Sequence, residues 1–600
     1  MPVHLDFKAV KLSWILLVAL ALLAGFLRLE HQLAVAESDV LARSPQGDEH
    51  TFVEWAHSVA RGNDDALPYQ APLYPTVLGA LERAGLDPTT DARLLQALLG
   101  LVTAGLAARI GFECTRDRRV ALVAFLLAAF ARPLIHAEGT LLREAASATV
   151  LAAAALAYVR TRTRGRLEDH AALGLALGLG LVLRENFAVV ALAVLAERVF
   201  VGVVRRERKT LGAVGVLLVA AALPVLPFDL KVARLGGGVH LLPNWNQGCV
   251  FYLANRRDNP TEGSYAPPPF VTAGNPEGEV EGFESEARKR TGRELRGHEV
   301  GRFWLREGLH EVASAPMLFA GRVAHRALAS LAPFETAHQR DMELDSQGSW
   351  VLRAPLLDMG VLIGLALGGA IVAALAGKGE RAVLVLASAW WLSLLVAAFT
   401  TRYRVPATPL LAVLGALGAR AIARSATTKG PVALALLAPV VLVQGLRFFR
   451  APEDHVNAIR TRGHAGFLAA EESVHRGRVD LGFCLQAVHD LETARAANPG
   501  DTPVRLELAH AYLLLAKAYL DPPRPMLART ACLGAVAADP SLAIAWKVLG
   551  VTELALRRPH EAIEAFSHAD TSDPDVQRLL AEARERAKLA ADRPLPLTPR

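Results

Sequence analysis

The feature that most constrains the fold of this chain is a series of apolar runs, each close to the length of a membrane-spanning helix. A helix needs about 20 apolar residues to cross about 30 Å of hydrocarbon, and 52% of the 600 residues are hydrophobic. We therefore expect an all-α, polytopic membrane helix bundle with about 11 spans rather than a cytosolic globular protein. The runs lie at 11–29, 93–111, 119–137, 142–159, 170–184, 187–204, 210–228, 354–376, 382–400, 405–423 and 431–448.

The basic residues between these runs predict the orientation of the bundle. They fall on alternate connections, and short loops rich in lysine and arginine stay in the cytoplasm. The N-terminus is then cytoplasmic; the alternative for the first run is a signal peptide cleaved after Ala34-Val35-Ala36. The basic residues are Lys8, Lys11, Arg116–Arg119, Arg160–Arg166, Arg205–Lys209, Lys378, Arg381, Arg420, Arg424 and Lys429. The outward connections are 30–92, 134–141, 185–186, 229–353 and 401–404.

The C-terminal region has a different pattern, which is typical of a soluble helical repeat. We expect an α-solenoid of tetratricopeptide repeats at 455–592, after a membrane domain at 1–450 in which 229–353 is a large outer loop. With an odd number of spans the repeats lie outside the cytoplasm, where a disulfide between Cys484 and Cys532 is conceivable; two buried thiols are the alternative. The repeat positions are Trp546, Leu549, Gly550, Ala562, Phe566, Ala569 and Pro574, and 34 residues earlier Tyr512, Leu515, Ala516, Ala528, Cys532, Ala535 and Pro540.

The first outer loop carries two adjacent carboxylates, Asp48 and Glu49, close to the first apolar run. A carboxylate at a membrane surface can take the proton of an acceptor hydroxyl in glycosyl transfer. It can also hold a divalent cation that neutralises a phosphate leaving group. The alternative is structural, because Asp48 stands where aspartate caps a helix that begins near Glu49. We expect short amphipathic helices at Glu49–Arg61 and Pro72–Glu82 in this loop.

Further charges stand at the outward ends of later runs. Glu138 lies between the third and fourth runs, Arg143 and Glu144 stand at the start of the fourth, and Arg184 ends the fifth, just before a short turn. Ionisable residues at the end of a span are candidates for a functional site. A pair of interfacial side chains that reach out toward water is the structural alternative for Arg143 and Glu144.

The fourth outward cluster is Arg402-Tyr403-Arg404, which precedes the tenth run. Two guanidinium groups without an acid nearby in the sequence are suited to a phosphate or pyrophosphate. They also stand on the side where the positive-inside rule disfavours basic residues. We therefore predict that Arg402 and Arg404 bind the phosphate of a lipid carrier.

The order of these motifs resembles the GT-C superfamily of membrane glycosyltransferases. The nearest resemblance is to bacterial protein O-mannosyltransferase-like and aminoarabinose-transferase-like proteins, in the subset with tetratricopeptide repeats. The resemblance covers about residues 10–425. The motifs that carry it are Gly47-Asp48-Glu49, Tyr69 to Pro75, Glu138 to Glu144, Leu183 to Asn186, Asn246-Gln247-Gly248 with Phe251-Tyr252, and Arg402 to Pro406.

The resemblance implies a role for each candidate residue. Asp48 would be the catalytic base with Glu49 beside it, and Glu144 would be the second acid, with Glu138 as its alternative. Asp48 and Glu144 would also be the ligands of a divalent metal cation. The family commonly has Asp where this chain has Glu144, which puts the metal geometry in doubt. The implied substrate-binding residues are Arg402, Arg404, Tyr403, Arg143, Arg184 and Glu138.

Together these features predict an enzyme that transfers a sugar from a polyprenyl-phosphate donor to an acceptor at the periplasmic or outer membrane face. It would be an integral protein of the bacterial inner membrane, with a peptide or protein partner on its repeats. The net charge of +6 arises in short loops and does not indicate nucleic-acid binding. The alternatives are a membrane transporter or flippase and a repeat-bearing assembly scaffold of envelope glycan synthesis. Ionisable residues at span ends rather than at the bilayer midplane disfavour the transporter.

Overall fold

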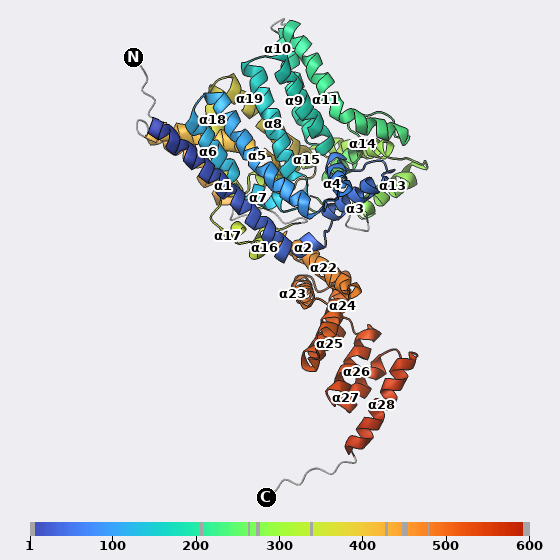
Figure 1. Cartoon of the computed structure of the whole chain (residues 1–600). Coiled ribbons are helices and arrows are strands. Elements are labelled where there is room, and N and C mark those ends of the chain that lie inside the picture. The colour runs from blue at the N-terminus through green and yellow to red at the C-terminus, as the bar shows by residue number, and fades with distance from the viewer. Residues whose placement is uncertain are drawn as a thin grey trace. The chain divides into compact units, whose positions relative to one another are not determined.

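The computed structural model describes residues 7–204, 208–261, 265–271, 276–335, 340–426, 430–446, 454–477 and 479–591. Within these residues every regular element is a helix, as the apolar runs predict, apart from one isolated bridge between Ala131 and Leu357 (Figure 1). The chain divides into two compact units. The second contains the helices from α22 (Asp454–His475) onward, together with Asp39–Gln46 and Arg340. Residues 205–207 and Lys429, both in predicted basic loops, lie outside the described residues.

Ten of the predicted apolar runs each fall on one helix of the first unit. Six segments of described helix are long and apolar enough to cross a membrane: Leu17–Ser38, Thr90–Thr115, Phe187–Val204, Thr210–Arg234, Lys378–Val396 and Thr401–Ser425. The count of about 11 spans thus remains a prediction. The helices on the runs are α1 (Phe7–Ser38), α5 (Thr90–Thr115), α8 (Glu144–Thr163), α9 (Leu167–Leu183), α10 (Phe187–Val204), α11 (Arg208–Arg234), α18 (Met359–Leu375), α19 (Lys378–Val396), α20 (Thr408–Ala426) and α21 (Gly430–Gly445).

The predicted run 119–137 is not one span. It is divided into α6 (Arg118–Ala129) and α7 (Arg132–Glu138). Pro133 lies in the first turn of α7, and the residue before a proline is disfavoured in helical conformation. The backbone at the break bonds elsewhere, because Arg132 N–H donates to Leu357 O at 2.9 Å. The single-span prediction was wrong since it ignored this proline.

Small residues allow the apolar helices to approach closely. A side chain at Gly178 of α9 would clash with the backbone of Ala221 on α11, and one at Gly369 of α18 with the carbonyl oxygen of Leu414 on α20. Such contacts drive helix association in a membrane, where the hydrophobic effect adds little. The buried core of this bundle is accordingly rich in alanine and leucine. Helices α5, α8, α9 and α11 form neighbouring pairs in chain order (Figure 1).

The large outer insertion has its own core around Trp304, which is fully buried. Trp304 Nε1 donates to Phe283 O at 3.0 Å and packs against Tyr252, Phe270 and Phe303. The core joins α12 (Gln247–Asn255), α13 (Pro276–Thr291) and α14 (His298–Ser314), and α15 (Pro316–Leu331) follows α14 in the chain.

The charged sequence from about Glu281 to Glu311 predicts one helical stretch in this insertion, but two helices are present there. The chain turns between α13 and α14, where Gly292 has φ +66° and Gly297 has φ +51°. Glycine adopts this left-handed conformation without steric cost. Gly292 therefore ends α13, and Gly297 allows α14 to begin.

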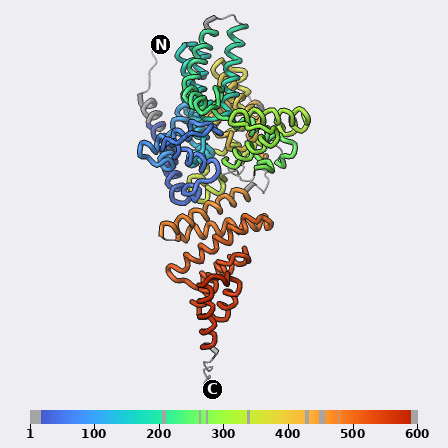
Figure 2. Tube along the Cα trace, turned by 90° about the vertical axis from the view of Figure 1, so that its right-hand side faces the viewer, coloured from blue at the N-terminus to red at the C-terminus, as the bar shows by residue number. Residues whose placement is uncertain are grey.

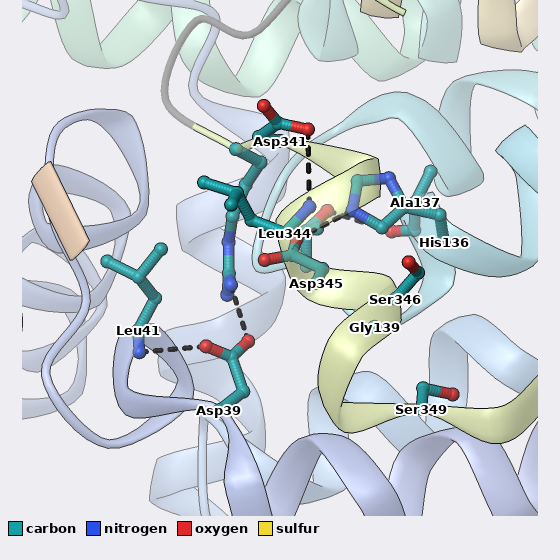
Figure 3. Close-up of polar contacts among 12 residues, drawn as sticks. Asp39, Leu41, His136, Ala137, Gly139, Asp341, Leu344, Asp345, Ser346 and Ser349 are labelled. Carbon is teal, nitrogen blue, oxygen red and sulfur yellow. Dashed lines mark hydrogen bonds and ion pairs between the residues drawn. The ribbon is translucent and has the colours of Figure 1, made fainter. Parts of the chain in front are cut away.

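Two short helices, α16 (Met342–Gly348) and α17 (Trp350–Arg353), follow the insertion. Asp341 caps α16 by accepting a hydrogen bond from Glu343 N at 2.8 Å. His136 of α7 pairs with Asp345 of α16, with 2.7 Å between Nε2 and Oδ2 (Figure 3). This pair fixes α16 against the end of α7, which leads into the candidate site.

The second unit is a succession of helix pairs (Figure 2). At Gly550 a side chain would meet the ring of Phe566 at about 2.5 Å, so this glycine allows two helices to pack closely. Cys484 and Cys532 are separate buried thiols, so the conceivable disulfide is not formed. The helical pattern is confirmed, while its assignment to tetratricopeptide repeats stays a prediction. The helices are α22, α23 (Leu481–Ala497), α24 (Thr502–Ala518), α25 (Pro525–Ala538), α26 (Ala543–Ala555), α27 (Pro559–His568) and α28 (Pro574–Ala591).

The N-terminal segment of this unit is α2 (Val40–Arg43). Asp39 caps it by accepting from Leu41 N at 2.9 Å and forms an ion pair with Arg340 (Figure 3). Helix α2 packs on α22, and the guanidinium of Arg43 lies 5.2 Å from the ring centre of Phe483.

Candidate active site

Both amphipathic helices expected in the first outer loop are present, as α3 (Asp48–Arg61) and α4 (Leu73–Arg83). Asp48 is the first residue of α3, and Gly47 occupies the cap position without a side-chain hydrogen bond. The capping prediction for Asp48 was therefore wrong. Its carboxylate instead accepts from Gln70 Nε2 at 3.0 Å and from Arg402 Nη2 at 2.6 Å.

Arg402 joins Asp48 to the second predicted acid. It lies in a 3₁₀ helix, η1 (Thr401–Ala407), which enters α20. Its Nε is 3.7 Å from Oε1 of Glu144, and the same oxygen accepts from Arg184 Nη1 at 3.0 Å. Glu144 is the first residue of α8, and Arg184 follows the last residue of α9. Residues far apart in the sequence thus meet in one cluster.

The ring of Tyr403 lies close to two guanidinium groups of this cluster. The Arg184 guanidinium is 4.4 Å and that of Arg402 is 5.4 Å from its ring centre. Arg184 Nε also donates to Asn186 Oδ1 at 3.1 Å, and Asn186 donates to Ser393 Oγ at 2.8 Å. Stacking on an aromatic face and a fixed side-chain amide orient both cations.

Arg143 completes the basic side of the site. Its guanidinium lies 5.4 Å from the ring centre of Phe52, and Nη1 is 3.5 Å from Oε1 of Glu185. The same Glu185 oxygen accepts from Asn244 Nδ2 at 2.7 Å. Asn244 and Asn246 are joined by a further hydrogen bond of 2.9 Å, so the outer insertion contributes directly to this cluster.

The charges around Asp48 determine its ionisation. Burial alone would raise the pKa of this carboxyl, but the charge and hydrogen bond of Arg402 lower it, aided by Gln70 and the charge of Arg143. The net effect holds the pKa of Asp48 well below its ordinary value. Asp48 is consequently ionised at neutral pH, and it is a weak base while Arg402 remains bound to it.

Three buried acceptor atoms in this network have no hydrogen-bond donor among the described residues: Gln70 Oε1, Glu144 Oε2 and Asn244 Oδ1. The amide nitrogens of Gln70 and Asn244 donate to carboxylates, which orients the two amides. A buried acceptor without a donor costs free energy. All three atoms would be satisfied by hydroxyl groups, which donate as well as accept.

Glu49 is also buried on the first turn of α3, with 2% of its surface exposed. Its charge and that of Glu144 act on Tyr74 of α4. Burial is the main reason that the pKa of the Tyr74 hydroxyl is raised, and the two carboxylates raise it further. Glu49 therefore lies in the same acidic environment as Glu144, next to Asp48 in the chain.

Glu279 was not expected in the site. Its Oε2 accepts from the hydroxyl of Tyr69 at 2.9 Å, one residue before Gln70, and Thr51 of α3 donates to the neighbouring Glu277 at 2.8 Å. Burial, opposed by the Tyr69 hydrogen bond and supported by the charge of Asp48, raises the pKa of Glu279 to about 7. No local sequence pattern distinguishes Glu279 from its acidic neighbours.

Arg404 does not face the cluster, although it is only two residues from Arg402. Its side chain is fully buried, and each of its five N–H donors has an acceptor. It therefore holds the backbone before α20 rather than presenting free donors. The acceptors are Thr401 O, Ser330 O, Ala332 O, Phe334 O and the carboxylate of Glu335.

Glu138 is likewise outside the cluster. Its Oε2 lies 2.9 Å from Arg28 Nε, and its Oε1 accepts from Arg28 Nη2 at 3.1 Å. A side chain at Gly100 would overlap the Glu138 carboxylate, so this position of α5 requires glycine. The pair is a buried two-point link between α1 and α7, and Glu144 is the second acid that meets Asp48 through Arg402.

The predicted metal ligands, Asp48 and Glu144, do not form a metal site in this arrangement. Arg402 lies between the carboxylates of Asp48 and Glu144, so a guanidinium holds the position that a cation would need. In the part of the chain that the structure describes, no group of three or more His, Cys, Asp or Glu side chains is placed to hold a metal ion. As they are arranged here, these residues do not fit the expected divalent cation.

A comparison with protein families matches part of the chain. Residues 70–228 match the family described as dolichyl-phosphate-mannose-protein mannosyltransferase. The matched segment contains Gln70, Arg143, Glu144 and Arg184 but neither Asp48 nor Arg402. No curated protein matches the chain. Over this segment the chain is similar to membrane glycosyltransferases that use a polyprenyl-phosphate sugar, and its apolar helices fit an integral membrane protein.

Proposed function

We propose that this protein transfers a sugar from a polyprenyl-phosphate donor to an acceptor at the non-cytoplasmic face of the membrane. The observation that carries the proposal is the bridge from Asp48 through Arg402 to Glu144, beside three buried acceptors that lack donors. An arginine suits the carrier phosphate, the acceptors suit hydroxyl groups of a sugar or acceptor, and a freed carboxylate can act as a base.

The central step is an exchange of partners by Arg402. The phosphate of the bound donor takes the guanidinium of Arg402, because a phosphate can form two parallel charge-assisted hydrogen bonds with it. Asp48 then loses the partner that lowers its pKa and becomes a better base for the acceptor hydroxyl. The base is therefore activated only when the donor is present, which limits unproductive hydrolysis.

The remaining residues position these groups. Glu144 offers Oε2 to a hydroxyl while its other oxygen holds Arg184. Tyr403, Arg184 and Arg143 orient the basic side, and Glu49 supports the acidic side. We assign Arg404 and Glu138 to positioning of the backbone around the site instead of substrate contact. This revises the substrate-binding roles that the sequence suggested for them.

The location of the site is part of the proposal. The site joins residues of the connections 30–92, 185–186, 229–353 and 401–404. Arg143 and Glu144 follow the connection 134–141, and the basic loops predict all these connections to be on one outer side. For a bacterial inner membrane this side is periplasmic. The proposed helical repeats of the second unit would bind a peptide or protein partner, through which an acceptor could be recruited.

Sugar transfer by the purified full-length chain in lipid nanodiscs tests the proposal. Polyprenyl-phosphate mannose is the first donor to use, and the lost lipid-linked sugar and the mannosylated product are both quantified. We expect Asp48→Asn to lower the transfer rate by about 10²–10⁴-fold, the usual contribution of general-base catalysis. Glu54→Gln, an exposed acid on the same helix, should retain full activity. Equal activity of the two variants would refute the role of Asp48.

A further inference from the structure

A second charged cluster surrounds Glu113, whose side chain is fully buried. Arg109 Nη2 lies 2.8 Å from Glu113 Oε1, and Arg116 Nη2 lies 3.0 Å from Oε2. Arg164 pairs with Oε1, and Arg160 Nε is 3.6 Å from the same atom. One buried carboxylate thus gathers four arginines, which we call the Glu113 cluster.

The cluster is built by the C-terminal ends of two apolar helices. Arg109 and Arg116 come from the end of α5, and Arg160 and Arg164 from the end of α8. Arg116 has φ +53°, a left-handed conformation that favours glycine. An arginine in this position directs its side chain back onto Glu113. Neutralising the ends of two helices does not require four cations on a single acid.

The arginines exceed what Glu113 can satisfy. Four guanidinium groups carry about 20 N–H donors, whereas a carboxylate has about four acceptor sites. Four positive charges against one negative charge leave a net charge of +3 on these five residues. The arginine side chains are 29–59% exposed. The excess donors and charge therefore face outward from the protein.

Two of the neighbouring acids are engaged by other cations. Asp117 lies 3.5 Å from Arg420 of α20. Glu197 pairs with Arg162 and with Arg198, 2.7 Å away. Glu380 of α19 lies near Cys114 and offsets part of the excess, so the Glu113 cluster keeps a net positive charge.

The position of the cluster indicates the kind of anion. Glu144 of the candidate active site begins α8, and Arg160 and Arg164 end it. A helix of 20 residues is about 30 Å long, the thickness of a bilayer core. The cluster thus lies at the opposite end of a bilayer-length helix, at the depth of lipid headgroups. The basic loops predict this end to be cytoplasmic.

We propose that the Glu113 cluster binds the phosphodiester headgroup of an anionic phospholipid in the leaflet opposite the candidate active site. Basic clusters between membrane helices recognise such headgroups, and Glu113 holds the guanidinium groups in a fixed array. The bound headgroup would link the ends of α5 and α8, and so secure the helix that carries Glu144.

Lipid retention by the full-length protein tests this proposal. The protein is placed in nanodiscs of equal parts phosphatidylglycerol and phosphatidylcholine, extracted into detergent, and its retained lipids are counted by native mass spectrometry. We expect phosphatidylglycerol to be enriched. Arg116→Gln/Arg164→Gln should reduce the enrichment by about 30-fold, on the basis of about 1 kcal/mol for each basic residue at the membrane surface.

The matched control is Arg118→Gln/Arg119→Gln. These two arginines are exposed beside the same loop, and among the described residues they form no ion pair. It should retain the wild-type enrichment. An equal loss in both double variants would overturn the proposal in favour of diffuse attraction. Release of phosphatidylglycerol by millimolar inorganic phosphate would also overturn it, because the ligand would then be a free anion. If the first double variant does not fold, equal retention of both lipids by the wild-type protein would overturn it as well.

Discussion

The contrast between Arg402 and Arg404 shows how two residues of one short motif take different roles. A 3₁₀ helix has about three residues per turn, so residues two apart point in different directions. Arg402 faces two carboxylates, whereas Arg404 faces a shell of backbone carbonyls and Glu335. The sequence predicted a phosphate site at this motif, but it could not say which arginine faces it, because the partners come from distant segments.

Replacing each arginine by lysine separates the two roles. Lysine keeps the charge but has three donors instead of five. Arg404→Lys should lower the free energy of unfolding by about 1–3 kcal/mol, because buried carbonyls lose their donors, while donor KM stays near the wild-type value. Arg402→Lys should raise donor KM with a smaller effect on stability. Thermal unfolding in detergent and initial transfer rates check both, and the opposite pattern would reverse the assignment.

Glu279 predicts a pH dependence of donor binding. Its pKa is raised to about 7, so its carboxyl is neutral below this pH and gains a negative charge near Asp48 above it. Donor phosphate should therefore bind less tightly as the pH rises through about 7. The raised pKa also makes the folded protein less stable as the pH rises from the ordinary glutamate pKa of about 4.3 to about 7.

The measurement is kcat/KM for the donor across about pH 5 to 9, for the wild-type protein and for Glu279→Gln. Tyr69 and Asp48 also face this group, but neither titrates near neutral pH, since the pKa of Tyr69 is raised and that of Asp48 is lowered. The step near pH 7 should disappear in the variant. A step that persists there would come from another group.

At the scale of elements, the apolar periodicity predicted most helices because each run has a simple physical requirement, burial of backbone and apolar surface in lipid. The prediction failed where a local signal opposed the run, as at Pro133 between α6 and α7. It also failed to divide the outer insertion at Gly292 and Gly297. The contribution of α13 to the site was beyond prediction, because it depends on how the insertion packs around Trp304.

The close crossing of α18 and α20 gives a prediction at this scale. A Cβ atom at Gly369 would lie about 1.7 Å from Leu414 O, so Gly369→Ala should push α20 away and lower stability by about 1–3 kcal/mol. Because α20 follows η1, transfer activity should fall as well. Gly105→Ala is the control, since a Cβ atom there meets nothing within 4 Å. Equal unfolding temperatures for the two variants would contradict this packing argument.

At the scale of the whole molecule, the sequence predicted that several outer connections share one site. The ion pairs of Arg402 with Asp48 and Glu144 join connections that are more than 200 residues apart. The particular partners Gln70, Asn244 and Glu279 were not predicted, because single polar residues in long loops carry no periodic signal. The family match covers residues 70–228 only, so the residues on either side rest on the geometry of the site.

We propose that Arg402 passes from Asp48 to the phosphate of the donor. Equilibrium binding of a non-transferable polyprenyl phosphate tests this exchange most directly. Asp48→Asn should bind this lipid more tightly than the wild-type protein, because Asp48 no longer competes for Arg402, although the variant transfers little sugar. Glu49→Gln removes the same charge one residue away and should change binding much less. Unchanged or weaker binding by Asp48→Asn, or an equal gain in both variants, would contradict the exchange.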